Sequence, residues 1–191
     1  MIYPEKNFGL TSLPGLSEKQ ISEHIKLYAG YVKNINSLNE KLEKMRMDAN
    51  ADAYIIAELK RRIGFEFNGM RLHDFYFGDL GGNGVITEDG KLKSALASQY
   101  GSFENWLKDF KATAMMRGTG WAILYYDEEI KRFFSVWVSS HEIGHLAGLK
   151  ILIALDVWEH AFLFDYLPSQ RKEYIEAYLS NLNWPKIENR F

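Results

Sequence analysis

The pattern of this 191-residue sequence changes abruptly at Gly81-Gly82-Asn83-Gly84, and the change restricts the folds open to it. Before this point apolar or amphipathic residues recur at helical spacing, first at positions 21, 24, 25, 28, 31, 32 and 35. After it, helical segments alternate with short runs rich in aromatic and β-branched residues. Glycine-rich breaks are typical of boundaries. We therefore predict an α+β protein, with an N-terminal α-helical hairpin domain over 1–82 and a C-terminal α/β domain over 83–191.

The first half is expected to be helical, because Ser17 is placed to cap a helix that runs over 18–46. A second helix is predicted over 51–63, and an apolar-rich stretch follows over 66–80. Further helices are predicted in the second half. Their expected ranges are 91–101, 102–117 with Ser102 as the cap, and 169–182.

The strands of the second half should form a small, mainly antiparallel three-stranded sheet. Residues 120–138 are typical of a β-hairpin with Asp127-Glu128-Glu129 as its turn, and residues 150–155 form a third strand. Antiparallel order suits such short connections.

Composition excludes several classes of function. A net charge of −2 argues against a protein that binds nucleic acid through phosphate contacts. The chain has no cysteine, which excludes thiolate metal sites and disulfides and suits a reducing cytoplasm. We expect no signal peptide at the N-terminus and no membrane partner, because the longest apolar run, residues 151–155, is far too short to span a bilayer.

One short motif points to a zinc metalloprotease. His141, Glu142 and His145 fit H-E-x-x-H, in which two histidines on one helix face bind zinc and the glutamate acts as general base. The surrounding sequence opposes this interpretation, because both flanks are typical of strands and Ile151 stands where one protease class needs a third histidine. The protease is kept as an alternative.

Asp156 and His160 suggest a different metal site. Asp156 follows an apolar strand, where a buried carboxylate is costly without a partner, and one helical turn brings His160 to it. His24 and His73 also lie in apolar-rich segments, although a lone histidine there is more often a core or surface residue. A carboxylate with imidazoles suits iron or manganese better than structural zinc.

The segment Asp156-Val157-Trp158-Glu159-His160-Ala161 resembles the D-x-W-E-H-A signature of the iron/manganese superoxide dismutases. Further segments resemble that family in the same order, so that the similarity covers about residues 12–184. They are YVKNIN at 31–36, NGMRLHDFYF at 68–77, GSFENWLKDFKATA at 101–114, GTGWAIL at 118–124 and YIEAYLSNLNW at 174–184.

This resemblance implies an enzyme that converts superoxide to dioxygen and hydrogen peroxide at a mononuclear site. It implies one iron or manganese ion per subunit, without choosing between them, and a homodimer or homotetramer. A non-catalytic metal-binding protein on the same fold is the other alternative. The implied metal ligands are His24, His73, Asp156 and His160.

The resemblance also assigns neighbours of the metal. Tyr31 would gate the substrate funnel, Trp121 and Trp158 would form apolar walls, and Glu159 would reach across a dimer to the partner's ligand histidine. Lys26 and Lys33 are candidates for steering the anion, although helix lysines are more often simply solvated.

The first ligand departs from the family spacing. The family histidine precedes the tyrosine by eight residues, whereas His24 precedes Tyr31 by seven and Glu23 holds the eighth position. At ~100° per residue, seven residues return to within ~20° of the starting face and eight miss it by ~80°. We therefore expect His24 rather than Glu23 as the ligand.

Other departures concern the surroundings of the metal. Leu163 replaces a family tyrosine, and Tyr28 or Leu27 replaces the histidine that pairs with it across the dimer. Gly69 stands where many members have a glutamine that hydrogen-bonds the metal-bound solvent. The segment SHEIGH at 140–145 resembles the N-H-x-x-x-H loop in which some members place a histidine, which implies His141 for this role. His145 receives no role.

Overall fold

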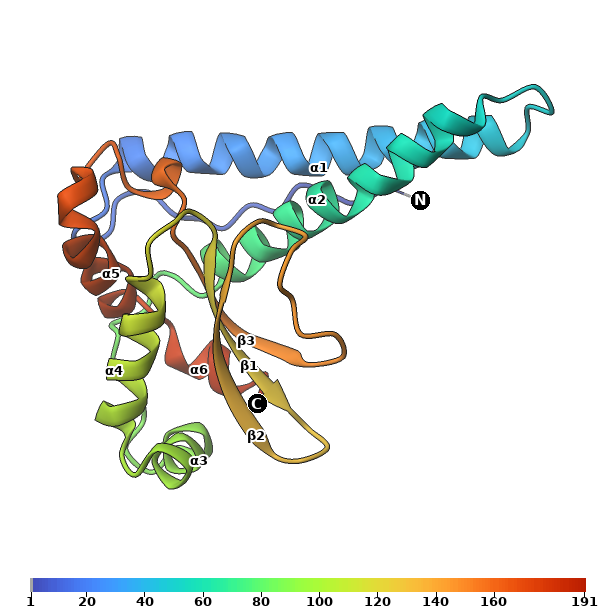
Figure 1. The fold of residues 1–191 in the computed structure, drawn as a ribbon. Helices are drawn as coiled ribbons and strands as arrows, with labels where there is room; N and C mark the ends of the chain where they lie inside the picture. Colours follow the sequence, from blue (N-terminus) through green and yellow to red (C-terminus); the bar gives the residue numbers. More distant parts are fainter. Residues whose placement is uncertain (1) are drawn as a thin grey trace.

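The computed structural model describes residues 2–191 and begins with a long helical hairpin (Figure 1). Helix α1 spans Glu18–Arg46 and α2 spans Ala53–Gly78. The side chain of Ser17 caps α1 by accepting from Gln20 N at 3.1 Å. The expected helix over 51–63 and the stretch over 66–80 form one continuous helix, whose interior glycines are tolerated because tertiary packing outweighs their cost of ~1 kcal/mol each.

The second half combines helices with a three-stranded sheet, which confirms the predicted fold class. The sheet order is β2-β1-β3, and both pairs are antiparallel. The elements are α3 Lys91–Tyr100, α4 Phe103–Ala114, β1 Trp121–Asp127, β2 Arg132–Val138, β3 Lys150–Asp156, the 3₁₀ helices η1 Glu159–Ala161 and η2 Pro168–Gln170, α5 Arg171–Ser180 and α6 Trp184–Glu188.

The β1–β2 turn lies one residue later than expected. Asp127 still pairs with Arg132 in the ladder, and residues 128–131 make the turn. The Asp127 carboxylate accepts from the backbone nitrogens of Glu129 and Ile130, at 2.9 and 3.2 Å. An aspartate that bonds the backbone two residues ahead typically starts a turn, so Asp127 serves both strand and turn.

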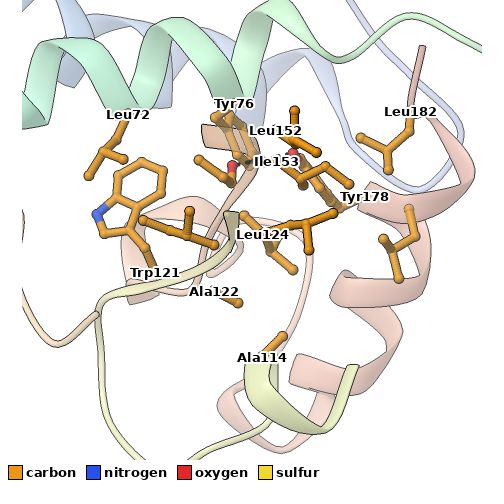
Figure 2. Packing of buried hydrophobic residues seen from close by; sticks show 14 of the residues in the cluster. Leu72, Tyr76, Ala114, Trp121, Ala122, Leu124, Leu152, Ile153, Tyr178 and Leu182 are labelled. Carbon is orange, nitrogen blue, oxygen red and sulfur yellow. Dashed lines mark hydrogen bonds between the residues drawn. The ribbon is translucent and has the colours of Figure 1, made fainter. Parts of the chain in front are cut away.

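The core lies between α2, the sheet and α5 (Figure 2). Leu72 and Tyr76 of α2 meet Trp121 and Leu124 of β1, and Tyr178 of α5 stacks on Tyr76 with ring centroids 5.0 Å apart. Packing α2 across the sheet carries its inward side chains to the end of β3. None of the helices within residues 2–191 is long and apolar enough to cross a membrane.

Candidate metal centre

Four side chains from four different elements converge at the junction of hairpin and sheet. One potential ligand atom of each lies within 4.8 Å of the others, and three of the four residues are buried. The residues are His24 of α1, His73 of α2, Asp156 at the end of β3 and His160 of η1. The sequence resemblance implied these same four, and the fold brings them together.

Helix α1 directs His24 inward because it is regular. The helix is α-helical throughout, so that the angular argument for His24 applies without a bulge. His24 is 1% exposed, whereas Glu23 lies at the surface and pairs with Lys26 at 2.7 Å. Glu23 therefore points away from the cluster.

Asp156 is the centre of the arrangement. Its Oδ2 atom lies 3.1 Å from Nε2 of His24, 3.1 Å from Nε2 of His160 and 3.5 Å from Nε2 of His73. Two ligands each ~2.1 Å from a common ion and 90–120° apart lie roughly 3.0–3.6 Å from one another. The spacing thus fits a single ion. Trp158 N donates to the other oxygen, Oδ1, at 2.8 Å and fixes the carboxylate plane.

His73 provides the clearest test of whether an ion fits. Its Nδ1 donates to the carbonyl oxygen of Gly69 at 2.6 Å, so that the proton of the neutral ring resides on Nδ1 and Nε2 has a free lone pair. Nε2 is buried and has no hydrogen-bond partner anywhere in the described chain. A buried acceptor aimed at a carboxylate is unfavourable unless a cation lies between them.

The charges of the cluster agree with this interpretation. Burial lowers the pKa of both His24 and His73, which keeps these imidazoles neutral and able to bind a metal. Burial alone would raise the pKa of Asp156, but His160 and the hydrogen bonds from His160 and His24 hold it well below its usual range. Conversely, the Asp156 carboxylate outweighs burial and raises the pKa of His160. An ionised carboxylate with imidazoles suits iron or manganese.

Tyr31 and His141 form a hydrogen-bonded pair beside this cluster. Trp121 donates its indole N–H to Nδ1 of His141 at 3.0 Å, so that the proton of the neutral histidine is on Nε2. Nε2 then donates to the Tyr31 hydroxyl at 2.7 Å. Burial lowers the pKa of His141 to about 4, and burial raises the pKa of Tyr31 to about 12, with smaller contributions from Asp156 and Glu66. Both groups are neutral around pH 7.

The geometry opposes the zinc protease. Residues 139–149 form an irregular loop rather than a helix, so that the two histidines of H-E-x-x-H do not share a helix face. His145 instead holds the loop, because Nε2 donates to the backbone oxygen of His141 and Nδ1 accepts from Tyr125, both at 2.6 Å. Glu142 is exposed and accepts from Ser140.

Aromatic rings surround the cluster. The Trp121 ring lies 5.0 Å from the ring of His73, and the Trp158 ring stacks 6.1 Å from that of His160. Two residues that differ from the family pattern lie at the surface, because Leu27 is 41% exposed and Leu163 is 46% exposed. Tyr28 is buried and accepts from Lys6 N, which leaves Leu27 as the residue that faces outward.

Sequence reasoning missed two residues that position the site. Gln20 donates to the backbone oxygen of His160 at 2.8 Å and accepts from Phe164 N at 3.0 Å, which holds η1 against α1. Tyr174 donates to the backbone oxygen of Asp156 at 2.7 Å. The spacing of Gln20, four residues before His24 on the same helix face, was the signal in the sequence that could have found it.

Comparison with known proteins agrees with the geometry. The alpha-hairpin domain model of the iron/manganese superoxide dismutases matches residues 7–81, and their C-terminal domain model matches residues 88–190. A superoxide dismutase (Fe) of Methanothermobacter thermautotrophicus is 35% identical over 93% of this chain and 87% of its own length. One of Cupriavidus metallidurans is 36% identical over 100% of this chain and 97% of its own length. With both family domains matched over nearly its whole length, this chain belongs to the iron/manganese superoxide dismutases.

Proposed function

We propose that this chain dismutes superoxide at an iron or manganese ion bound by His24, His73, Asp156 and His160. The observation that carries the proposal is the unpartnered Nε2 of His73 aimed at an ionised carboxylate in a buried site. The names of the relatives favour iron, and manganese is the alternative.

The bound metal would supply electron transfer, taking one electron from a first superoxide and giving it to a second. The chain supplies the environment. Asp156 contributes a negative charge, and the three histidines would contribute imidazole nitrogens to the ion, which together suit a di- or trivalent ion. Trp121 and Trp158 exclude water with their apolar faces.

Tyr31 and His141 are the proposed catalytic pair. His141 Nε2 donates to Tyr31 Oη, so that the hydroxyl proton of Tyr31 is free to point toward a small anion at the cluster. Reducing superoxide to hydrogen peroxide consumes two protons, and the Tyr31 hydroxyl is well placed to pass one on, because its ring lies 5.2 Å from that of His73.

The ligand set is tested by substitution. We expect His73→Ala to lose nearly all bound iron or manganese and all dismutation, because an imidazole donor is removed from a closed buried site. His145→Ala is the matched control, since it removes a histidine that only holds a loop, and it should keep the metal. Metal content and superoxide dismutation are measured on both proteins.

Two outcomes would favour the alternatives. Wild-type protein that holds metal without dismutation would favour the non-catalytic alternative, and zinc lost from His145→Ala would favour the protease.

We further propose that the protein works as a homodimer or homotetramer, in which Glu159 binds His160 of the partner subunit. Glu159 is exposed on η1 beside His160, whose side chain is 26% exposed. Leu27, Leu163 and Phe164 add exposed apolar surface on α1 and on the segment after η1. Phe164 is 51% exposed.

This assembly predicts that Glu159→Ala dissociates the oligomer partly and lowers metal retention, because the partner's His160 loses its acceptor. Light scattering and metal analysis measure the two effects. Glu173→Ala removes a carboxylate from the first turn of α5 instead and serves as the control. A monomeric wild-type protein with full activity would contradict the proposal.

The proposal also covers the domain division, the location and the partners of the protein. The matches over 7–81 and 88–190 support a division into domains at 1–82 and 83–191. The cysteine-free sequence supports a cytoplasmic location, and the net charge of −2 supports the absence of nucleic-acid partners.

A further inference from the structure

We infer that Arg62 attracts anions to the Tyr31–His141 side of the metal centre. Arg62 is not part of the sequence segments that resemble the family, and the inference rests on the proposed function only in taking superoxide as the anion of interest.

Helix α2 aligns Arg62 with the metal centre. Arg62, Glu66, Gly69 and His73 follow one another at spacings of four, three and four residues, which places them on one face of the helix. The stripe runs outward from His73, and eleven residues correspond to ~16 Å along the helix axis. Arg62 is therefore the outermost member of a line of side chains that leads to the proposed ligand.

The guanidinium group is held over this line by two contacts. It lies 3.8 Å from the centroid of the Phe65 ring, and its Nε donates to Glu66 Oε1 at 2.8 Å. The Phe65 ring in turn lies 4.6 Å from the ring of His141 and 5.9 Å from that of Tyr31. A guanidinium group held over an aromatic face keeps one position and orientation, whereas the ammonium group of an unpaired lysine moves with its flexible side chain.

The pair of Arg62 and Glu66 presents its positive end outward. The Glu66 side chain is 4% exposed and accepts a second hydrogen bond from Asn34, whereas the Arg62 side chain is 49% exposed. An anion that arrives from solvent meets the guanidinium before the carboxylate beneath it. Burial mainly sets the pKa of both Tyr31 and His141. At Tyr31 the Asp156 and Glu66 charges raise the pKa further and the Arg62 charge opposes them, which places the guanidinium within electrostatic reach of the hydroxyl.

Lys26, one of the two lysines suggested by the sequence, is less suitable for this role. The Nζ atom of Lys26 is bound to Glu23 at 2.7 Å, and the Lys26 side chain is 69% exposed. Its charge is thus compensated by a neighbour that is also at the surface, and salt screens such exposed pairs strongly.

The test compares Arg62→Gln with Arg71→Gln in the iron-loaded protein. Arg71 is a matched control on the same helix, because it also pairs with a carboxylate, Asp74, and lies over aromatic rings, those of Tyr3 and Phe67. The two variants have the same net charge. We measure kcat/KM for superoxide per bound iron ion, and the Kd of azide by optical titration, at ionic strengths of about 10 mM and about 500 mM.

We expect Arg62→Gln to lower kcat/KM and weaken azide binding about 2- to 10-fold at low ionic strength, as for the loss of one partly screened charge near the path of an anion. The difference should disappear at high ionic strength, and Arg62→Lys should restore most of it. Arg71→Gln should behave as wild type. Equal losses at both ionic strengths, or equal effects of the two glutamine variants, would overturn the inference. A wild-type protein without dismutation would refute the proposed function instead, and the azide measurement would still test Arg62.

Discussion

At the scale of single residues, His141 lies beside the metal centre without contributing to the cluster of four potential ligands. It accepts from Trp121 and donates to Tyr31, so that neither ring nitrogen is left for the direct hydrogen bond to metal-bound solvent that the resemblance implied. The sequence indicated His141 through a resemblance around residues 140–145. It did not indicate which nitrogen carries the proton, because Trp121 lies 20 residues away and only the fold brings the indole N–H to Nδ1.

We predict that His141→Gln keeps stoichiometric metal but changes the relative activities of the iron- and manganese-loaded forms. A carboxamide can reproduce both hydrogen bonds, but its donor strength differs from that of an imidazole, and neighbours of this kind tune the reduction potential of a metal. Metal content and the two activities are the measurements. Loss of the metal itself would show that His141 is a ligand.

At the scale of elements, the crossing of α1 and α2 determines the position of Tyr31. Gly69 of α2 lies against the ring of Tyr31, and a Cβ atom at Gly69 would come within 2.6 Å of its Cδ1 atom. The glycine therefore allows the two helices to approach closely. Gly69 O also accepts from His73, so that one residue positions both Tyr31 and a proposed ligand.

Gly69→Ala should consequently destabilise the protein by about 1–3 kcal/mol, because overpacking at the ring exceeds the helix propensity gained. It should also lower kcat by displacing Tyr31 from His141. Gly30→Ala is the matched control, since a Cβ at Gly30 in α1 meets nothing within 4 Å and should stabilise the helix by roughly 0.5–1 kcal/mol. Urea unfolding and steady-state kinetics measure both effects. An unaltered Gly69→Ala protein would show that the helices separate at little cost.

The elements also show where local sequence signals were sufficient. Ser17 and Ser102 marked two helix starts correctly, because a cap acts within one turn. The sequence did not predict that α2 is one continuous helix, and it did not predict the short helix α6. Both depend on distant packing, as when Trp184 at the start of α6 donates to Gly84 O, 100 residues earlier in the chain. Likewise, the contacts of Arg62 with Phe65 and Glu66 are local, but their position beside His141 comes from the fold.

At the scale of the whole molecule, a buried ion pair joins the helical hairpin to the C-terminus. Asp79 caps α2, and its Oδ2 accepts from Arg190 at 2.6 Å, while the same guanidinium nitrogen donates to Leu152 O of β3. The other carboxylate oxygen, Oδ1, is buried and finds no hydrogen-bond partner within residues 2–191. Burial therefore outweighs the attraction of Arg190 and raises the pKa of Asp79 to about 6.

The Asp79–Arg190 ion pair predicts that the free energy of unfolding decreases as the pH rises. A carboxyl group whose pKa is higher in the folded than in the unfolded state keeps its proton better when folded, so that stability falls as the pH rises through the folded pKa. Asp79→Asn removes the titration and retains an acceptor for Arg190. We expect the free energy of unfolding of wild type, relative to Asp79→Asn, to fall by about 1 kcal/mol between pH 5 and pH 7.5. Urea unfolding of both proteins across this range measures the difference. Parallel curves, or a difference that grows with pH, would mean that Arg190 and not burial determines the pKa of Asp79. The Asp79–Arg190 ion pair would then stabilise the protein at neutral pH.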